Sequence, residues 1–205
     1  KLIKWNFLKR EIIGVHGISL TEKQADSFKA LIWCPNSNLF LQNKTAAIDE
    51  LKKHTTILFG TDSTLSADWN IWNQLRTARS TNLLSDEELF NTVTKSAAAI
   101  WNLNAGILEK EKDADIVIAK RKHLHNHSDN FFLLNPEDIL LILSKGKIVL
   151  FDECLLMQLK QEELIKSFSK IFMNNSCKYV KGDLPALIKM VWQYNPDSIF
   201  PVETD

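Results

Sequence analysis

A short apolar run that ends on a carboxylate, residues 56–62, constrains the fold more than any other stretch. Its branched and aromatic side chains, closed by Gly60, are typical of a strand buried on both faces, and such strands belong to parallel sheets covered by helices. Ligands of parallel α/β proteins bind beyond the carboxyl ends of the strands, so we expect Asp62 to face a site. An Asp that only turns a loop is the competing interpretation.

Two more buried strands are expected before this run. Residues 12–17 predict the first, with His16 at its end. Residues 31–34 predict the second, which Pro35 stops because proline has no amide proton for a central ladder. A polar turn over residues 35–38 is expected at the carboxyl end of this second strand.

Helices are expected between and after the strands. Capping boxes predict helix starts at Thr21 and at Ser85, and helix formers occupy residues 45–53. Asp68 is expected to cap a further helix after the polar loop that follows Asp62. This alternation of strands and helices predicts an α/β fold with a parallel sheet.

The pattern changes after Gly106. A charge run over residues 109–113 is typical of a solvated turn. Strands are then expected over residues 115–119, 138–143 and 147–151. From residue 155 onward we expect a helical tail. The sequence therefore predicts an α/β part over residues 1–105, a small β module over residues 106–153 and a helical tail over residues 154–205.

Composition excludes some classes of partner. Lys plus Arg and Asp plus Glu each number 25, so no net field recruits nucleic acid or an anionic membrane, and a small substrate is the better expectation. Cys34, Cys154 and Cys177 are scattered without metal-ligand spacing, which indicates free thiols in a reducing cytoplasm. Neither a long apolar run nor a secretory leader is apparent, so we expect no membrane span and a cytoplasmic location.

Several short motifs occur in a particular order. The main ones are Val15-His16-Gly17, Cys34-Pro35-Asn36-Ser37-Asn38 with Leu41, and Gly60-Thr61-Asp62-Ser63. Further support comes from Arg76, Ala78, Thr94 and residues 97–99, 106–109, 114–117 and 145–147. Over the first three quarters of the chain, these motifs resemble the carboxyl-terminal half of the metal-dependent amidohydrolase superfamily, in its deaminase and chlorohydrolase-like branch.

That resemblance implies a (β/α)8 TIM-like barrel, of which this chain carries the carboxyl-terminal part, with the β module beside it as part of a small sandwich. Asp62 would be the metal ligand on the last strand, and both His16 and Asp62 would be catalytic. His16 would contact the substrate and the reaction intermediate. Ser37 and Asn38 would support the site from the seventh barrel strand, which lies between the strands of His16 and Asp62.

The resemblance also implies a cofactor, one divalent metal ion. Zinc is the first expectation, with iron and manganese as alternatives, and most of the ligands would lie outside this chain. Ser63, beside Asp62, is expected to support the pocket, and Trp69, in the loop that follows, is expected to line the substrate mouth.

The sequence departs from that family where other metal ligands should be. The paired His motif of the first barrel strand and the His of the fifth have no counterpart before His16, and only three of eight strands are visible. A barrel with so few strands has open edges. We therefore interpret the chain as a fragment whose missing amino-terminal half carries most of the metal ligands.

The expected function is a metal-dependent hydrolase of the amidohydrolase or deaminase type, which activates water to attack a C–N bond other than a peptide bond. Its substrate would be small and cyclic or heteroaromatic, and the isolated fragment would be inactive. One alternative is a non-catalytic fragment that only packs against a partner or the missing half. Another is ring opening of a cyclic amide rather than deamination. The sequence leaves open whether the protein forms a homodimer.

Three other features have plainer interpretations. The His-rich residues 123–127 resemble a metal motif but are expected to form a surface loop. His54 precedes a strand at its amino end and is expected to be structural. Cys34 is expected to be a small buried hydrophobe rather than a nucleophile, because nothing nearby in the sequence would activate it.

Overall fold

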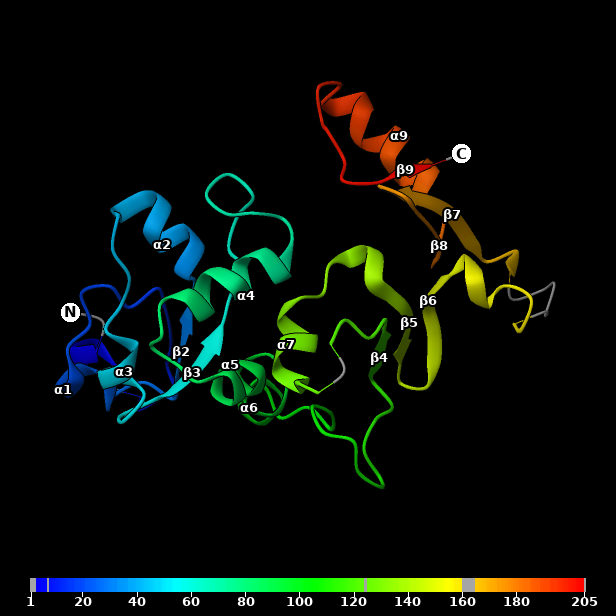
Figure 1. The fold of residues 1–205 in the computed structure, drawn as a ribbon. Coiled ribbons are helices and arrows are strands. Elements are labelled where there is room, and N and C mark those ends of the chain that lie inside the picture. The colour runs from blue at the N-terminus through cyan, green and yellow to red at the C-terminus, as the bar shows by residue number, and fades with distance from the viewer. Residues whose placement is uncertain (1–2, 7, 124, 160–164, 205) are drawn as a thin grey trace. The chain divides into compact units, whose positions relative to one another are not determined.

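The computed structural model describes residues 3–6, 8–123, 125–159 and 165–204. The chain divides into two compact units, Lys1–Lys112 and Asp113–Asp205, and each is described here by itself (Figure 1). In the described part of the chain, every helix is too short or too polar to cross a membrane.

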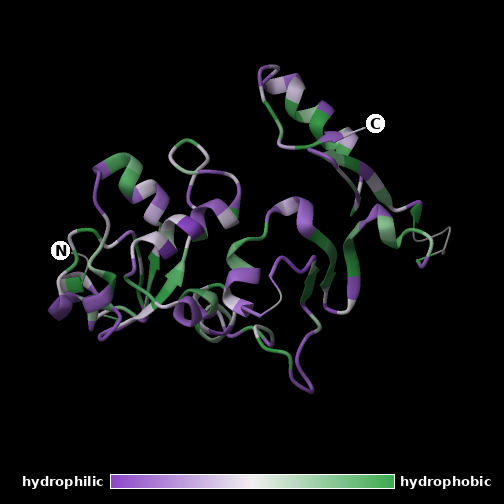
Figure 2. Cartoon of the chain, in the orientation of Figure 1, coloured by the Kyte–Doolittle hydropathy of each residue, from purple (hydrophilic) through white to green (hydrophobic). Residues whose placement is uncertain are grey.

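The first unit is built on a three-stranded parallel sheet, as the sequence predicts. Its strands are β1 (Ile13–Val15), β2 (Ala30–Trp33) and β3 (Thr56–Phe59), in that order across the sheet. The central strand β2 is the best buried, and Trp33 on it is fully covered. Strands β2 and β3 are coloured as hydrophobic in Figure 2.

The expectation that β1 is a buried strand is wrong, because none of its residues is fully buried. Val15, at its end, is 53% exposed. Within the described residues β1 pairs only with β2, at the edge of the sheet, so one of its sides has no neighbouring strand.

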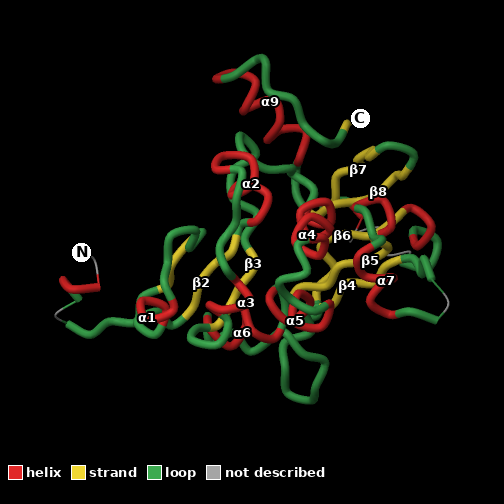
Figure 3. The backbone as a smooth tube through the Cα atoms, turned by 60° about the vertical axis from the view of Figure 1, so that its left-hand side comes forward, coloured by secondary structure: helices red, strands yellow, loops and turns green. Residues whose placement is uncertain are grey.

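Short helices connect and follow these strands. They are η1 (Ile3–Trp5), α1 (Glu22–Ala25), α2 (Pro35–Gln42), α3 (Ile48–Leu51), α4 (Ile71–Ser80), α5 (Asp86–Thr92) and α6 (Lys95–Ile100). The capping boxes expected at Thr21 and Ser85 are both present. Figure 3 shows these helices in red beside the yellow strands.

Two helix starts differ from the prediction. The expected polar turn after β2 is the first turn of α2, because proline at the first helical position has a suitable fixed φ and needs no hydrogen bond there. Asn70 rather than Asp68 caps α4, with its side chain accepting from the backbone N of Trp72 at 2.9 Å. Asp68 instead accepts from the backbone N of Asn70 at 2.8 Å and so orders the loop.

The second unit is a six-stranded antiparallel sheet, ordered β4-β5-β6-β8-β7-β9. Its strands are β4 (Ile116–Ala119), β5 (Ile139–Ser144), β6 (Lys147–Asp152), β7 (Phe168–Met173), β8 (Ser176–Lys181) and β9 (Glu203–Thr204). Its helices are α7 (His127–Phe132), η2 (Pro136–Asp138), η3 (Glu153–Leu155) and α9 (Leu184–Tyr194). The three strands expected over residues 115–151 are present as β4, β5 and β6.

The expectation of a wholly helical tail is wrong. Phe168 and Ile171 have helical spacing, but they lie on β7, which forms a hairpin with β8. Asn174 in the two-residue connection has a φ of 50°, a conformation that asparagine tolerates better than most residues and that suits a tight hairpin. The final helix, capped by Asp183, is present as α9.

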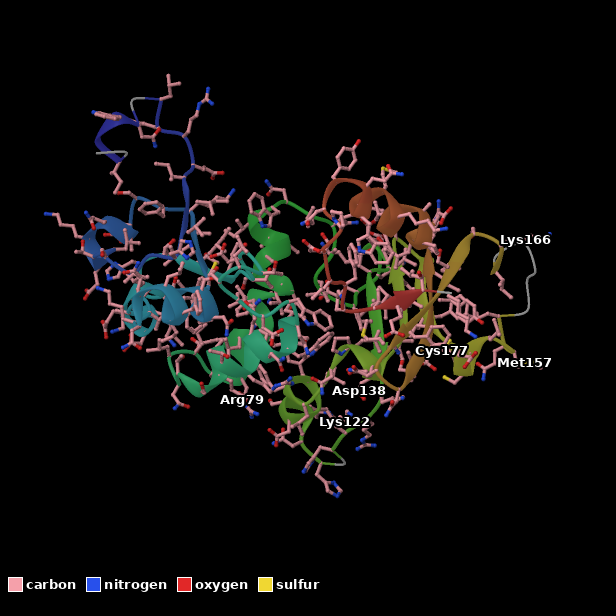
Figure 4. All side chains as sticks on the ribbon, turned by 90° about the horizontal axis from the view of Figure 1, so that it is seen from above. Arg79, Lys122, Asp138, Met157, Lys166 and Cys177 are labelled. Atoms are coloured by element: carbon pink, nitrogen blue, oxygen red, sulfur yellow. The ribbon has the colours of Figure 1, made fainter. Side chains whose placement is uncertain are left out.

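Ion pairs inside the second unit join segments that are distant in the sequence. Lys178 on β8 is 1% exposed, and its Nζ donates to Asp152 Oδ2 at 2.9 Å and to the backbone oxygen of Ile139 at 2.6 Å. Lys122 Nζ lies 2.6 Å from Asp138 Oδ1, and Figure 4 labels both residues. The Lys178 contacts attach the tail hairpin to the β module, so the two share one sheet.

Candidate functional site

The carboxyl ends of the three parallel strands bring three potential ligands together. His16 follows β1, Cys34 follows β2, and Asp62 lies just beyond β3. One ligand atom from each of these side chains lies within 4.8 Å of the others. Since parallel strands end at the same edge of a sheet, this convergence follows from the fold. Sequence reasoning paired His16 with Asp62 but left Cys34 out.

Backbone hydrogen bonds fix the turn that carries His16. Its φ is 67°, and its backbone N donates to the oxygen of Ile32 at 2.9 Å. Gly17 also has a positive φ of 70°, and a Cβ there would lie 2.6 Å from Leu31 Cδ2. The sequence His-Gly therefore suits a sharp turn pressed against β2.

Asn38 holds the imidazole ring of His16. Its Oδ1 lies 2.9 Å from His16 Nδ1, and its Nδ2 donates to the backbone oxygen of His16 and to Thr45 Oγ1, each at 3.4 Å. Because those two partners accept from the amide nitrogen, Oδ1 is the atom that faces the ring, and we assign the proton to Nδ1. Nε2 is then the nitrogen directed at Asp62, 3.7 Å from its Oδ2.

Asp62 lies on a turn that needs a glycine. Its own φ is 58°, which aspartate tolerates. A Cβ on Gly60 would come within 2.5 Å of Ile32 Cγ2 and 2.8 Å of Cys34 Sγ. The chain can therefore pass this close to β2 only without a side chain at residue 60. The side chains of His16 and Asp62 are 39% and 28% exposed, so both remain open to solvent.

The thiol of Cys34 is buried beside the carboxylate of Asp62. Burial, with the negative charge of Asp62 as the smaller cause, raises the pKa of Cys34 to about 11. The thiol is therefore protonated at neutral pH in the absence of a cation, which supports the expectation that Cys34 is not a free nucleophile.

A cleft of about 550 Å³ opens next to His16, within the first unit. Ser37 and Asn38 line it from α2, and apolar side chains that include Ile18, Leu20 and Leu41 surround them. This arrangement of mostly apolar walls with a few polar groups suits a small organic ligand.

Ser63 and Trp69, both expected at the pocket, lie in the loop that follows Asp62. Neither lines this cleft. Ser63 Oγ accepts from the backbone N of Leu65 at 3.2 Å and turns its own loop, while Trp69 is 48% exposed. Ser37 Oγ contacts Ser66 Oγ at 2.8 Å, so it ties α2 to the loop that follows Asp62.

The other histidines do not belong to this cluster in the described residues. His123, His125 and His127 are exposed, and Leu124, between the first two, is outside the described residues. His54 Nδ1 lies 2.9 Å from Asp26 Oδ1, a structural contact near the amino end of β3. Among the described residues, the group of His16, Cys34 and Asp62 is the metal-capable cluster.

The model of the Amidohydrolase family matches residues 4–149. The chain belongs to the amidohydrolase family. A 5-methylthioadenosine/S-adenosylhomocysteine deaminase of Pyrococcus horikoshii is 28% identical over 185 residues, which are 80% of this chain and 43% of that protein. The deaminase of the same description from Caldanaerobacter subterraneus is 23% identical over 160 residues, covering 67% of this chain and 37% of that protein.

Solved structures of amidohydrolases share the fold. Aminofutalosine deaminase of Helicobacter pylori matches with a TM-score of 0.59 at 22% identity, over 67% of this chain and 38% of that one. Guanine deaminase of E. coli matches with a TM-score of 0.56 at 22% identity, again over 67% and 38%. The resemblance seen in the motifs is thus confirmed for the family. This amidohydrolase chain spans about two fifths of the length of these relatives, and closure into a (β/α)8 barrel stays a prediction.

Proposed function

We propose that this amidohydrolase chain is the carboxyl-terminal part of a metal-dependent deaminase. The enzyme would hydrolyse a C–N bond of a small heteroaromatic substrate, with adenosine-type nucleosides as the first class to examine. The observation that carries this proposal is the pairing of His16 Nε2 with Asp62 Oδ2 at 3.7 Å beyond the ends of β1 and β3. The similarity to the 5-methylthioadenosine/S-adenosylhomocysteine deaminases supports the substrate class.

The residues at this edge fit a divalent cation. An imidazole nitrogen and a carboxylate oxygen are common zinc ligands, and both lie within reach of one ion. Asp62 would hold the ion from this chain, and residues outside it would complete the site. When bound, an ion of this type would lower the pKa of its water to about 7.

Asp62 and His16 would have different roles in the reaction. The carboxylate of Asp62 would accept a proton from the attacking water, because it lies beyond the end of β3 and faces the site. His16 holds its Nδ1 proton against Asn38 Oδ1, so Nε2 is the nitrogen that faces the site and would contact the ion or the substrate held beside it. Asn38 is a positioning residue that sets this orientation.

A substrate panel with the full-length enzyme tests the proposal. Release of ammonia is measured from 5-methylthioadenosine, S-adenosylhomocysteine and guanine, with a cyclic amide included to detect ring opening. We expect turnover of a nucleoside that is lost after treatment with a chelator and returns when zinc is added. Turnover that survives complete removal of metal contradicts the proposal.

A non-catalytic fragment is the second candidate. The observation that favours it is the open edge of the described three-stranded sheet, on which β1 and β3 each have one neighbour. If the 205-residue chain occurs in cells without any amino-terminal complement and binds no metal, this second candidate replaces the first. Intact mass measured under non-denaturing conditions distinguishes them.

A further inference from the structure

Cys34 is placed as a metal ligand would be, although nothing in the family resemblance gives it that role. Its sulfur lies within 4.8 Å of the ligand atoms of His16 and Asp62, which are themselves 3.7 Å apart. Ligand atoms on one tetrahedral zinc ion stand roughly 3.3 to 3.8 Å apart, given bonds of about 2.0 to 2.3 Å. The His16–Asp62 separation therefore already matches, and the sulfur needs to move by no more than about 1.5 Å.

Two features fix the sulfur in this position. Cys34 caps α2, and its backbone oxygen accepts from Asn38 N at 3.0 Å, so the first turn of the helix holds its main chain. Gly60 leaves open the space that the sulfur occupies, since a Cβ there would be only 2.8 Å from Sγ. The sulfur thus packs against the backbone that leads directly to Asp62.

The three cysteines differ in their surroundings. Cys154 and Cys177 are free and lie in the second unit. Cys34 is the cysteine that shares a cluster with a histidine and a carboxylate among the residues that the structure describes. This difference provides matched thiol controls within the same chain.

We infer that Cys34 Sγ, His16 Nε2 and Asp62 together bind one thiophilic divalent cation. When the cation binds, the sulfur–metal bond forms and the thiol proton passes to solvent. A nitrogen, sulfur and oxygen set of this kind prefers Zn²⁺ or Co²⁺ to Mg²⁺, and water or ligands outside this chain would complete the coordination. The inference rests on the proposed metal-dependent function and adds a ligand to it.

Titration of the 205-residue chain with Co²⁺ tests the inference. A cobalt–thiolate bond gives a charge-transfer band in the near ultraviolet, which oxygen and nitrogen ligands do not produce. We expect this band to saturate at one equivalent, and Zn²⁺ but not Mg²⁺ to abolish it. Cys34→Ser should lose the band and bind Co²⁺ at least about tenfold more weakly, since even changes behind the ligands cost about 10- to 100-fold. The control Cys177→Ser should keep both properties.

The inference is overturned if folded chain binds Co²⁺ without the band, if the band survives in Cys34→Ser, or if no Co²⁺ binds. Far-ultraviolet circular dichroism verifies folding of each variant. If Cys34→Ser does not fold, zinc-edge X-ray absorption of the unaltered chain tests the inference instead. We expect one sulfur ligand at about 2.3 Å from the zinc, and the absence of any sulfur ligand would contradict the inference. Loss of the sulfur ligand would leave the deaminase proposal intact, because that proposal is tested separately by turnover.

Discussion

The side chain of Asn38 determines which nitrogen of His16 faces Asp62. It is 1% exposed, and its amide contacts the ring, the backbone of His16 and the hydroxyl of Thr45. Thr45 also accepts from Trp33 Nε1 at 2.6 Å, so a fully buried indole orders the same network. Satisfied buried networks of this kind hold one geometry, because each unpaired member would be costly.

Replacing Asn38 tests this network. Asn38→Leu keeps the approximate volume but leaves His16 Nδ1 without its acceptor, so the first unit should lose about 1–3 kcal/mol of unfolding free energy. In the ¹⁵N spectrum, His16 should change from a single Nδ1-protonated form to a mixture of tautomers. Denaturant titration and NMR measure the two effects. The control Gln42→Leu, on the exposed part of the same helix, should change neither, and an unchanged His16 spectrum in Asn38→Leu contradicts the assignment.

At the level of elements, the sequence predicts the strands of the first unit better than the ends of its helices. The apolar runs before His16, Pro35 and Asp62 give β1, β2 and β3, because strand burial depends on local composition. The helix expected to start at Ser85 ends as α5 at Thr92, and α6 follows after a break at Thr94 that no local signal marks. Likewise, Cys34 lies near His16 and Asp62 only because β2 pairs with both β1 and β3, and the local sequence does not reveal this pairing.

The capping box of α5 leads to a prediction about how the stability of the first unit depends on pH. The ammonium of Lys52, then the backbone N–H of Ser85, hold the pKa of Glu88 below its ordinary value. Because the folded pKa is depressed, this stabilisation is present above the unfolded pKa of about 4.3 and is lost as the pH falls through the folded value. Glu88→Gln should cost less than about 1 kcal/mol at pH 7, since the pair is partly exposed, and progressively less toward pH 3.

Denaturant titrations at several pH values measure this difference. The control Glu87→Gln changes a neighbouring, exposed glutamate of the same helical turn and should show a smaller effect at every pH. A cost of Glu88→Gln that stays constant between pH 7 and pH 3 would exclude the charge of Glu88 as its cause.

At the level of the whole molecule, the chain divides into two compact units, Lys1–Lys112 and Asp113–Asp205, and the tail belongs to the second of them. The contacts of Lys178 explain why the secondary structure of the tail cannot be predicted from the spacing of its apolar residues. The spacing of Phe168 and Ile171 fits a helix, but the β7–β8 hairpin completes a sheet whose other strands lie earlier in the chain. The buried ion pair with Asp152 attaches that hairpin to β6.

Breaking this pair should destabilise the second unit. Lys178→Met leaves Asp152 largely buried without its cation, and removal of one partner of a buried pair costs about 3–5 kcal/mol. The exposed Lys181 on the same strand provides the control Lys181→Met, for which we expect less than about 0.5 kcal/mol. Calorimetry of both variants measures the difference. Equal melting temperatures would show that the hairpin does not depend on Lys178.

Turnover of Asp62→Asn in the full-length, zinc-loaded enzyme decides whether Asp62 takes part in metal-dependent deamination. The substitution keeps the shape of the side chain but removes its charge and its ability to accept the proton of water. We expect kcat to fall by about 10²–10⁴-fold. The control Asp49→Asn, an exposed aspartate of the first unit, should retain full activity. Undiminished turnover in Asp62→Asn would contradict the account.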